Sequence, residues 1–182
     1  MNVRETKLPG VLLIEPKIWG DPRGWFVELY HSERYAQHGL PRSFVQDNAS
    51  ASTRGVLRGL HFQNPNGQGK LVFPLEGEIW DVAVDVRRGS KTFGQWFGAT
   101  LAAEKKQQIW VPAGFAHGFV VTSERAVVMY KCTDVYNAKA EWGIRWDDPD
   151  LAIDWPVKTP VLSDKDKVYP KLKDLPAKAL FD

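Results

Sequence analysis

Short apolar segments with strict alternation recur along this chain, and they constrain its fold more than any other feature. In residues 79–86, Trp80, Val82, Val84 and Val86 alternate with smaller or acidic side chains. A period of two places the two sets on opposite faces of a pleated strand and does not fit a helix. The segment is therefore predicted to be a β-strand.

Similar composition predicts strands elsewhere, because each run is rich in β-branched and aromatic residues and is bounded by turn-forming residues. Strands are expected at residues 10–15, 24–30, 43–49, 56–62, 69–74, 95–101, 107–111, 117–122 and 126–136. Short helices are expected only at 32–37, capped by Ser32, and as one turn at 102–106. Many short strands in 182 residues favour an all-β jelly-roll sandwich.

The chain is expected to form a single domain over residues 1–182, since its length suits one hydrophobic core. Residues 155–182 are rich in Pro and Lys and lack strand periodicity. They are expected to wrap the sandwich as an irregular or helical extension.

The charge balance and the cysteine count exclude several classes of protein. Lys plus Arg number 24 and Asp plus Glu 22, so the net charge of +2 does not indicate a nucleic-acid-binding surface. The single cysteine, Cys132, excludes an intramolecular disulfide framework and fits a cytoplasmic location. The first apolar run, residues 11–14, is too short for a signal peptide or a membrane span, and no membrane association is expected.

Two of the four histidines lie in settings that suggest chemistry. His31 and His38 have polar neighbours and are interpreted as surface residues, whereas His61 ends an apolar strand and His117 lies in a P-x-G-x-x-H segment. That segment is half of the metal-binding pattern of cupin-type jelly rolls. The other half, an H-x-H pair, is missing because Gln63 stands two residues after His61. Too few ligands remain, so neither a metal nor another cofactor is expected.

His61 is instead a candidate general base, because a free imidazole with a pKa of about 6.5 exchanges protons near neutrality. Lys70, Arg54 and Arg58 lie near it in sequence and could meet an anionic substrate or a developing oxyanion. Tyr130 shares a strand face with Val128 and Cys132, and a phenol suits proton donation. From these residues alone, a buried histidine and a buried tyrosine with structural roles are equally acceptable interpretations.

Several uncommon sequence strings occur in a fixed order over about 150 residues, and together they are far more specific than any one of them. They include GDPRG, FVQDN, RGVLRGLH, GKLV, DVAVD, WVPAGFAHGF and LSDKD, which lie between residues 20 and 166. In these strings the chain closely resembles the dTDP-4-dehydrorhamnose 3,5-epimerases, a family of cupin-like jelly rolls that act in dTDP-L-rhamnose synthesis.

The resemblance implies a metal-free epimerase that inverts carbons 3 and 5 of dTDP-4-dehydro-6-deoxy-D-glucose by removing and returning protons. It assigns His61 as the base, Asp166 as the carboxylate that orients its ring, and Tyr130 as the acid on the opposite face. Lys70 is assigned to the carbon 4 oxygen, where its charge would stabilise the enolate.

The resemblance also assigns a binding set and an oligomeric state. The residues expected to bind the dTDP-sugar are Arg23, Glu28, Gln46, Asn48, Arg58, His117, Glu141 and Lys165, with Tyr136 stacking on the thymine. Asp81 is expected to pair with His117. The family implies a homodimer in which N-terminal segments cross to the neighbouring subunit.

Three details depart from the family pattern or need a structural explanation. Ala49 and Phe62 stand where many members have histidine and tyrosine, which leaves the nucleotide contacts open to difference. Ideal alternation places Arg58 and His61 on opposite faces of one strand. Both can serve one site only if Gly59 admits a bulge or if the pocket wraps the end of the strand.

Three alternatives stay open at the level of sequence. A relative that inverts only carbon 3 or only carbon 5 of a related dTDP-4-keto-sugar could keep the same acid and base. A metal-dependent cupin enzyme is a more distant alternative. A sugar-nucleotide-binding module without catalysis is the third.

Overall fold

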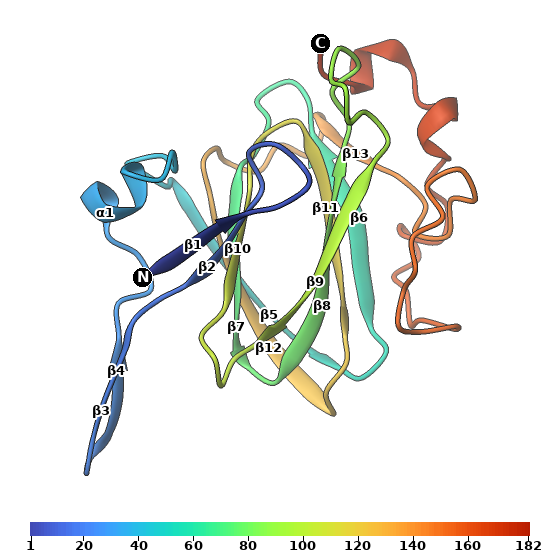
Figure 1. The fold of residues 1–182 in the computed structure, drawn as a ribbon. Helices are drawn as coiled ribbons and strands as arrows, with labels where there is room; N and C mark the ends of the chain where they lie inside the picture. The colour runs from blue at the N-terminus through green and yellow to red at the C-terminus, as the bar shows by residue number, and fades with distance from the viewer.

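Two antiparallel β-sheets face each other in the computed structural model, which describes residues 1–182 (Figure 1). The six-stranded sheet has the order β1 (Asn2–Glu5), β2 (Leu12–Glu15), β10 (Gln108–Val111), β7 (Lys70–Glu76), β12 (Arg125–Cys132), β5 (Gln46–Thr53). The five-stranded sheet has the order β13 (Glu141–Gly143), β6 (Leu57–Gln63), β11 (Phe115–Val121), β8 (Glu78–Asp85), β9 (Trp96–Ala102). The predicted all-β sandwich is confirmed.

The remaining elements lie outside the two sheets. Strands β3 (Ile18–Asp21) and β4 (Gly24–Val27) form a separate hairpin that projects from the body of the sandwich (Figure 1). The other elements are α1 (Ser32–Ala36) and two short 3-10 helices, η1 (Leu172–Asp174) and η2 (Ala177–Ala179). None of the helices has the length and apolarity needed to cross a bilayer.

Hydrophobic clusters occupy three layers, one between the two sheets and one on the outer face of each. The middle cluster lies between the sheets and includes Val72 and Val128 from one sheet and Ala83 and Phe119 from the other. A second cluster covers the outer face of the five-stranded sheet, where Ile144, Leu151 and the extension predicted from residue 155 onward pack onto it. The third covers the outer face of the six-stranded sheet beneath α1. The C-terminal extension therefore completes a core and can also reach the edge of the sandwich.

Some predicted boundaries are wrong. The strand expected at 126–136 ends at Cys132, and the strand expected at 24–30 ends at Val27. Ser32 is the first helical residue of α1, whereas His31 occupies the N-cap position without a capping side-chain bond. Residues 103–106 form a turn rather than a helix. Strands β1, β3 and β13 were not predicted because their four-, four- and three-residue sequences lack an apolar alternation.

Strand β6 contains a bulge, the first of the two alternatives that the sequence left open. His61 pairs with His117 and Arg58 pairs with Phe119, so three steps along β6 match two steps along β11. The extra residue shifts the alternation by one position, and Arg58 and His61 therefore line the same cavity. Gly59 permits this shift because its φ of +130° is a conformation that side chains with a Cβ rarely adopt.

Gly59→Ala is expected to lower the thermal unfolding midpoint by roughly 5–12 °C, because it combines backbone strain with a clash. A Cβ at this position would lie 2.5 Å from Gly118 Cα and 2.8 Å from the His117 carbonyl oxygen. Calorimetry of Gly89→Ala provides the control, because a Cβ at Gly89 meets nothing within 4 Å. Equal midpoints for the two variants would contradict the proposed role of Gly59.

Candidate active site

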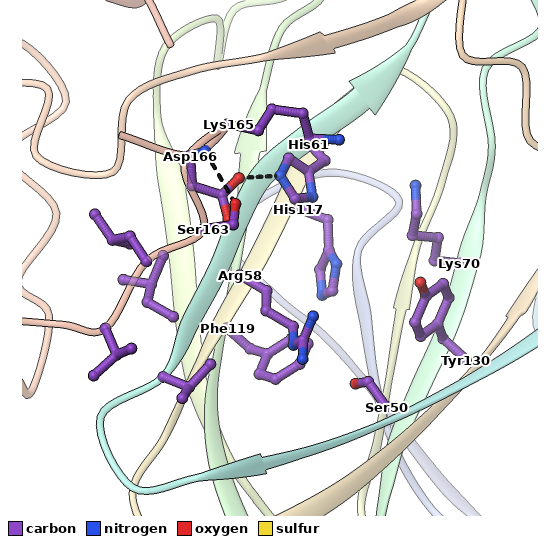
Figure 2. Close-up of a pocket in the computed structure, with 14 residues that line it drawn as sticks. Ser50, Arg58, His61, Lys70, His117, Phe119, Tyr130, Ser163, Lys165 and Asp166 are labelled. Carbon is purple, nitrogen blue, oxygen red and sulfur yellow. Dashed lines mark hydrogen bonds and ion pairs between the residues drawn. The ribbon is translucent and has the colours of Figure 1, made fainter. Parts of the chain in front are cut away.

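A cavity of about 440 Å³ opens between the two sheets, and both sheets and the C-terminal extension contribute to its wall (Figure 2). Its residues are Ser50, Val56, Leu57, Arg58, His61, Lys70, His117, Phe119, Tyr130, Val161, Leu162, Ser163, Lys165 and Asp166. A second cavity of about 210 Å³ adjoins it and shares His61, Lys70 and Tyr130 in its lining. These three residues therefore stand where the two cavities meet.

His61 is held by a carboxylate from the C-terminal extension. Its Nε2 lies 2.6 Å from Asp166 Oδ1, and Asp166 is only 3% exposed. Burial alone would raise the pKa of Asp166, but the hydrogen bond and charge of His61 lower it below its usual range. Asp166 is thus a carboxylate at neutral pH, and the bond to Nε2 leaves the His61 Nδ1 available to a substrate.

Tyr130 lies across the cavity from His61 (Figure 2). It projects inward from β12, because alternation along that strand turns Val128, Tyr130 and Cys132 toward the opposite sheet. Burial raises the pKa of the Tyr130 phenol above its usual value. The hydroxyl is therefore protonated at neutral pH and is equipped to donate.

Lys70 brings a positive charge to the junction of the two cavities. The side chain is largely buried, with 8% of the residue exposed, and its ammonium forms no ion pair with a carboxylate. Burial lowers the pKa of Lys70, and the opposing effects of Cys132 and Glu141 do not cancel this shift. A buried cation without a counter-ion is suited to stabilise an anion that enters or forms beside it.

A second histidine–carboxylate pair joins strand β11, which lies next to β6, to strand β8 in the same sheet. His117 Nε2 is 2.8 Å from Asp81 Oδ2, and both side chains are buried in the five-stranded sheet. The predicted pairing of these two residues is confirmed. Because His117 stands opposite His61 in the register of β11 and β6, the two imidazoles lie side by side on one wall of the cavity.

The structure brings most of the predicted binding residues to the two cavities. Arg58, His117 and Lys165 line the first cavity, and Gln46, Asn48, Tyr136 and Glu141 line the second. A polar network joins several of them: Lys165 Nζ lies 2.7 Å from Glu141 Oε1, and the Tyr136 hydroxyl donates to Glu141 Oε2 at 2.9 Å.

Arg23 and Glu28, the other two predicted binding residues, lie outside both cavities of their own chain. Arg23 sits at the tip of the β3–β4 hairpin, is 89% exposed in its side chain and pairs with Asp21 at 2.5 Å. Glu28 follows the hairpin and pairs with Arg34 at 2.6 Å. The hairpin projects away from the sandwich, so these two side chains do not line either cavity of their own chain (Figure 1).

Sequence reasoning missed Ser50, a cavity residue whose hydroxyl is buried without a hydrogen-bond partner. The alternation along β5 turns the side chains of Gln46, Asn48, Ser50 and Ser52 the same way. Gln46 and Asn48 were selected through the resemblance, and extending their period of two along the strand would have found Ser50.

In this β-sandwich a histidine–carboxylate pair faces a protonated tyrosine across one cavity, which supplies the groups needed for acid–base catalysis. The fold and the site together define an acid–base enzyme. A sequence model of the dTDP-4-dehydrorhamnose 3,5-epimerases matches residues 5–174. The dTDP-4-dehydrorhamnose 3,5-epimerase of Pseudomonas aeruginosa is 54% identical over 169 residues, which cover 92% of this chain and 93% of that protein.

A solved structure and a more distant relative extend this comparison. The crystal structure of dTDP-6-deoxy-D-glucose-3,5-epimerase from Legionella pneumophila in complex with dTDP-4-keto-L-rhamnose superposes with a TM-score of 0.96 and 50% identity, covering 99% of this chain and 97% of that one. A dTDP-4-dehydrorhamnose 3-epimerase of Streptomyces niveus is 41% identical over 92% of this chain and 82% of its own length. The chain belongs to the dTDP-4-dehydrorhamnose 3,5-epimerase family.

Proposed function

We propose that this isomerase inverts carbons 3 and 5 of dTDP-4-dehydro-6-deoxy-D-glucose to give dTDP-4-dehydro-L-rhamnose in dTDP-L-rhamnose synthesis. The placement of His61 and Tyr130 on opposite sides of one cavity carries the proposal (Figure 2). Inversion of a carbon centre needs a base on one face of the sugar ring and an acid on the other.

The chemistry follows from the ketone at carbon 4, which acidifies the hydrogens on carbons 3 and 5. His61 Nδ1 removes one proton, and Asp166 stabilises the imidazolium that forms. The Lys70 ammonium stabilises the negative charge that develops on the carbon 4 oxygen. Tyr130 then donates its phenolic proton to the opposite face of the carbon, which inverts it. The His61 imidazolium gives its proton to solvent and the Tyr130 phenolate takes one up before the second carbon reacts.

The second cavity is proposed to hold the nucleotide end of the substrate. Its lining combines amides, a carboxylate and the ring of Tyr136, which suit base edges, sugar hydroxyls and stacking on thymine. Arg58, His117 and Lys165 supply positive or hydrogen-bonding groups to the rest of the substrate. A cytoplasmic location is part of the same proposal and agrees with the single, unpaired Cys132.

The double inversion can be tested in deuterated water with purified protein and the keto-sugar nucleotide. Deuterium is expected at both carbon 3 and carbon 5 of the product, detected by NMR. Deuterium at one carbon alone would replace the proposal by a mono-epimerase, the activity named for the Streptomyces niveus relative. Unchanged dTDP-sugar would favour a binding module without catalysis.

Lys70 is expected to determine the pH above which kcat falls. Its ammonium is present below its lowered pKa and is lost as the pH rises through that value, so kcat is expected to fall there. Burial shifts the pKa values of Tyr130 and Cys132 in the opposite direction, upward from their usual values. Lys70→Arg is expected to move the alkaline limb of the kcat profile to higher pH. An unmoved limb would assign it to another group.

A homodimer is proposed because the β3–β4 hairpin exposes large aromatic side chains. Trp25 is 61% and Phe26 is 66% exposed in β4, and Arg23 lies at the hairpin tip that precedes this strand. In the proposed dimer the hairpin reaches the neighbouring subunit, where Arg23 and Glu28 join the substrate-binding set.

Replacing Trp25 and Phe26 together with serine is expected to convert the dimer to a monomer, because the aromatic surface that the neighbour would cover is removed. Light scattering coupled to size exclusion measures the change. Val168→Ser is the control, because Val168 is an apolar residue that is 78% exposed and belongs to the C-terminal extension rather than to the hairpin. A dimer that survives the double substitution would contradict the proposal.

A further inference from the structure

A tyrosine that follows Asp166 in the C-terminal extension packs directly against the ring of His61. The Tyr169 and His61 ring centroids lie 5.7 Å apart with an interplanar angle of 67°, an edge-to-face arrangement. Asp166 contacts the same imidazole at Nε2. One short segment of the extension therefore contacts His61 in two ways, by a hydrogen bond and by an aromatic ring.

Local structure holds this segment in shape. The Asp166 amide donates to Ser163 Oγ at 3.1 Å, and the Val168 amide donates to the Lys165 carbonyl at 3.2 Å. These bonds form a turn that sets Asp166 and Tyr169, three residues apart, against one imidazole. The backbone of Arg145 continues the attachment by donating to the Pro170 carbonyl at 2.9 Å.

The strand beside His61 leaves room for the Tyr169 ring. Gly143 is the register partner of His61 between β13 and β6. A Cβ at Gly143 would lie 2.5 Å from Tyr169 Cε1, too close for any real contact. Tyr169 thus occupies the space that the missing side chain of Gly143 leaves next to the imidazole.

The hydroxyl of Tyr169 forms no hydrogen bond of standard geometry, although the nearby Lys165 ammonium acts to lower the pKa of the phenol. Burial has the larger effect and raises that pKa to about 12. The contact that the structure shows is made by the aromatic ring. We infer that Tyr169 is a positioning residue, whose ring holds the His61 imidazole in the orientation that keeps Nε2 on Asp166 and turns Nδ1 to the substrate.

This inference rests on the proposed role of His61 as the base. A base that rotates out of line loses rate without losing substrate affinity, since small misplacements of a reacting group are costly. Tyr169→Ala is expected to lower kcat about 10-fold while KM and the Kd for dTDP change less than about twofold. Tyr169→Phe keeps the ring and is expected to retain the kcat of the unmodified protein.

Gly143→Ala provides an independent test, because it displaces the Tyr169 ring without removing it. We expect it to reproduce the kcat loss of Tyr169→Ala, and to cause no further loss when combined with that substitution. Gly89→Ala, at an open position, is the control.

The outcomes separate the inference from the proposed function. Full kcat in Tyr169→Ala, additive losses in the double variant, or an equal rise in KM and in the dTDP Kd would overturn the role of Tyr169. If His61→Asn also keeps full activity, the proposed base is wrong and the inference fails with it. If a Tyr169 result overturns its role while His61→Asn is inactive, the inference about Tyr169 fails and the proposed base stands.

Discussion

His61→Asn is expected to lower kcat by about 10³- to 10⁴-fold, the upper part of the 10²- to 10⁴-fold range that general base catalysis supplies. The amide keeps a polar side chain of similar size at the junction of the two cavities but cannot take a proton at neutral pH. Substrate binding should persist, because the side chains that line the second cavity, other than His61 itself, are unchanged. The expected signature is loss of deuterium exchange at carbons 3 and 5 with a nearly unchanged Kd for dTDP.

Two further variants define what that result means. His38→Asn changes an exposed histidine and is expected to have no effect. Asp166→Asn should lose less than His61→Asn, about 10- to 100-fold, because it removes the partner of the base and not the base. If His61→Asn exchanged deuterium at the rate of the unmodified protein, another group would be the base.

Asp166→Asn also has a consequence for stability. The carboxylate has a lowered pKa in the folded protein, so the stability it contributes is present above its unfolded pKa and is lost as the pH falls through the folded value. The difference in thermal midpoint between the unmodified protein and Asp166→Asn should therefore be largest at neutral pH and shrink on acidification.

The fold was predictable where burial imposes a simple period on the sequence. In β8, Val82 and Val84 pack beneath the C-terminal extension, while Ala83 faces the opposite sheet. Both faces of the strand are therefore buried, and its alternating residues belong to two different hydrophobic clusters. Strand β13 has no such signal, because only its pairing with β6 gives it an extended conformation. Its three residues could not be recognised without the neighbouring strand.

The candidate site was predictable in its residue types and less so in its contacts. The strings RGVLRGLH and LSDKD identified His61 and Asp166, but their hydrogen bond joins residues 105 positions apart and had to be inferred from the resemblance. Tyr169 had no sequence signal, because its importance depends on the absent side chain of Gly143. Arg23 was identified by its motif, whereas its place outside the cavities depends on the direction of a hairpin.

Tyr130→Phe is expected to separate proton removal from inversion, which no other single substitution in the cavity should do. Phenylalanine fills the same space on β12 but has no proton to give. His61 can still remove a substrate proton, exchange it with solvent and return deuterium to the same face of the ring. Inverted product should therefore fall by about 10²- to 10³-fold, while deuterium still enters the unreacted keto-sugar.

The ratio of exchange to inversion is the measurement that decides the role of Tyr130, and it can be read from one NMR time course in deuterated water. Tyr30→Phe is the matched control, because the Tyr30 hydroxyl donates to the Pro41 carbonyl on the outer side of the six-stranded sheet. It should leave the ratio unchanged. If Tyr130→Phe slowed exchange and inversion equally, the phenol would act on the enolate rather than as the proton donor. Unchanged inversion would mean that water or another residue protonates the second face.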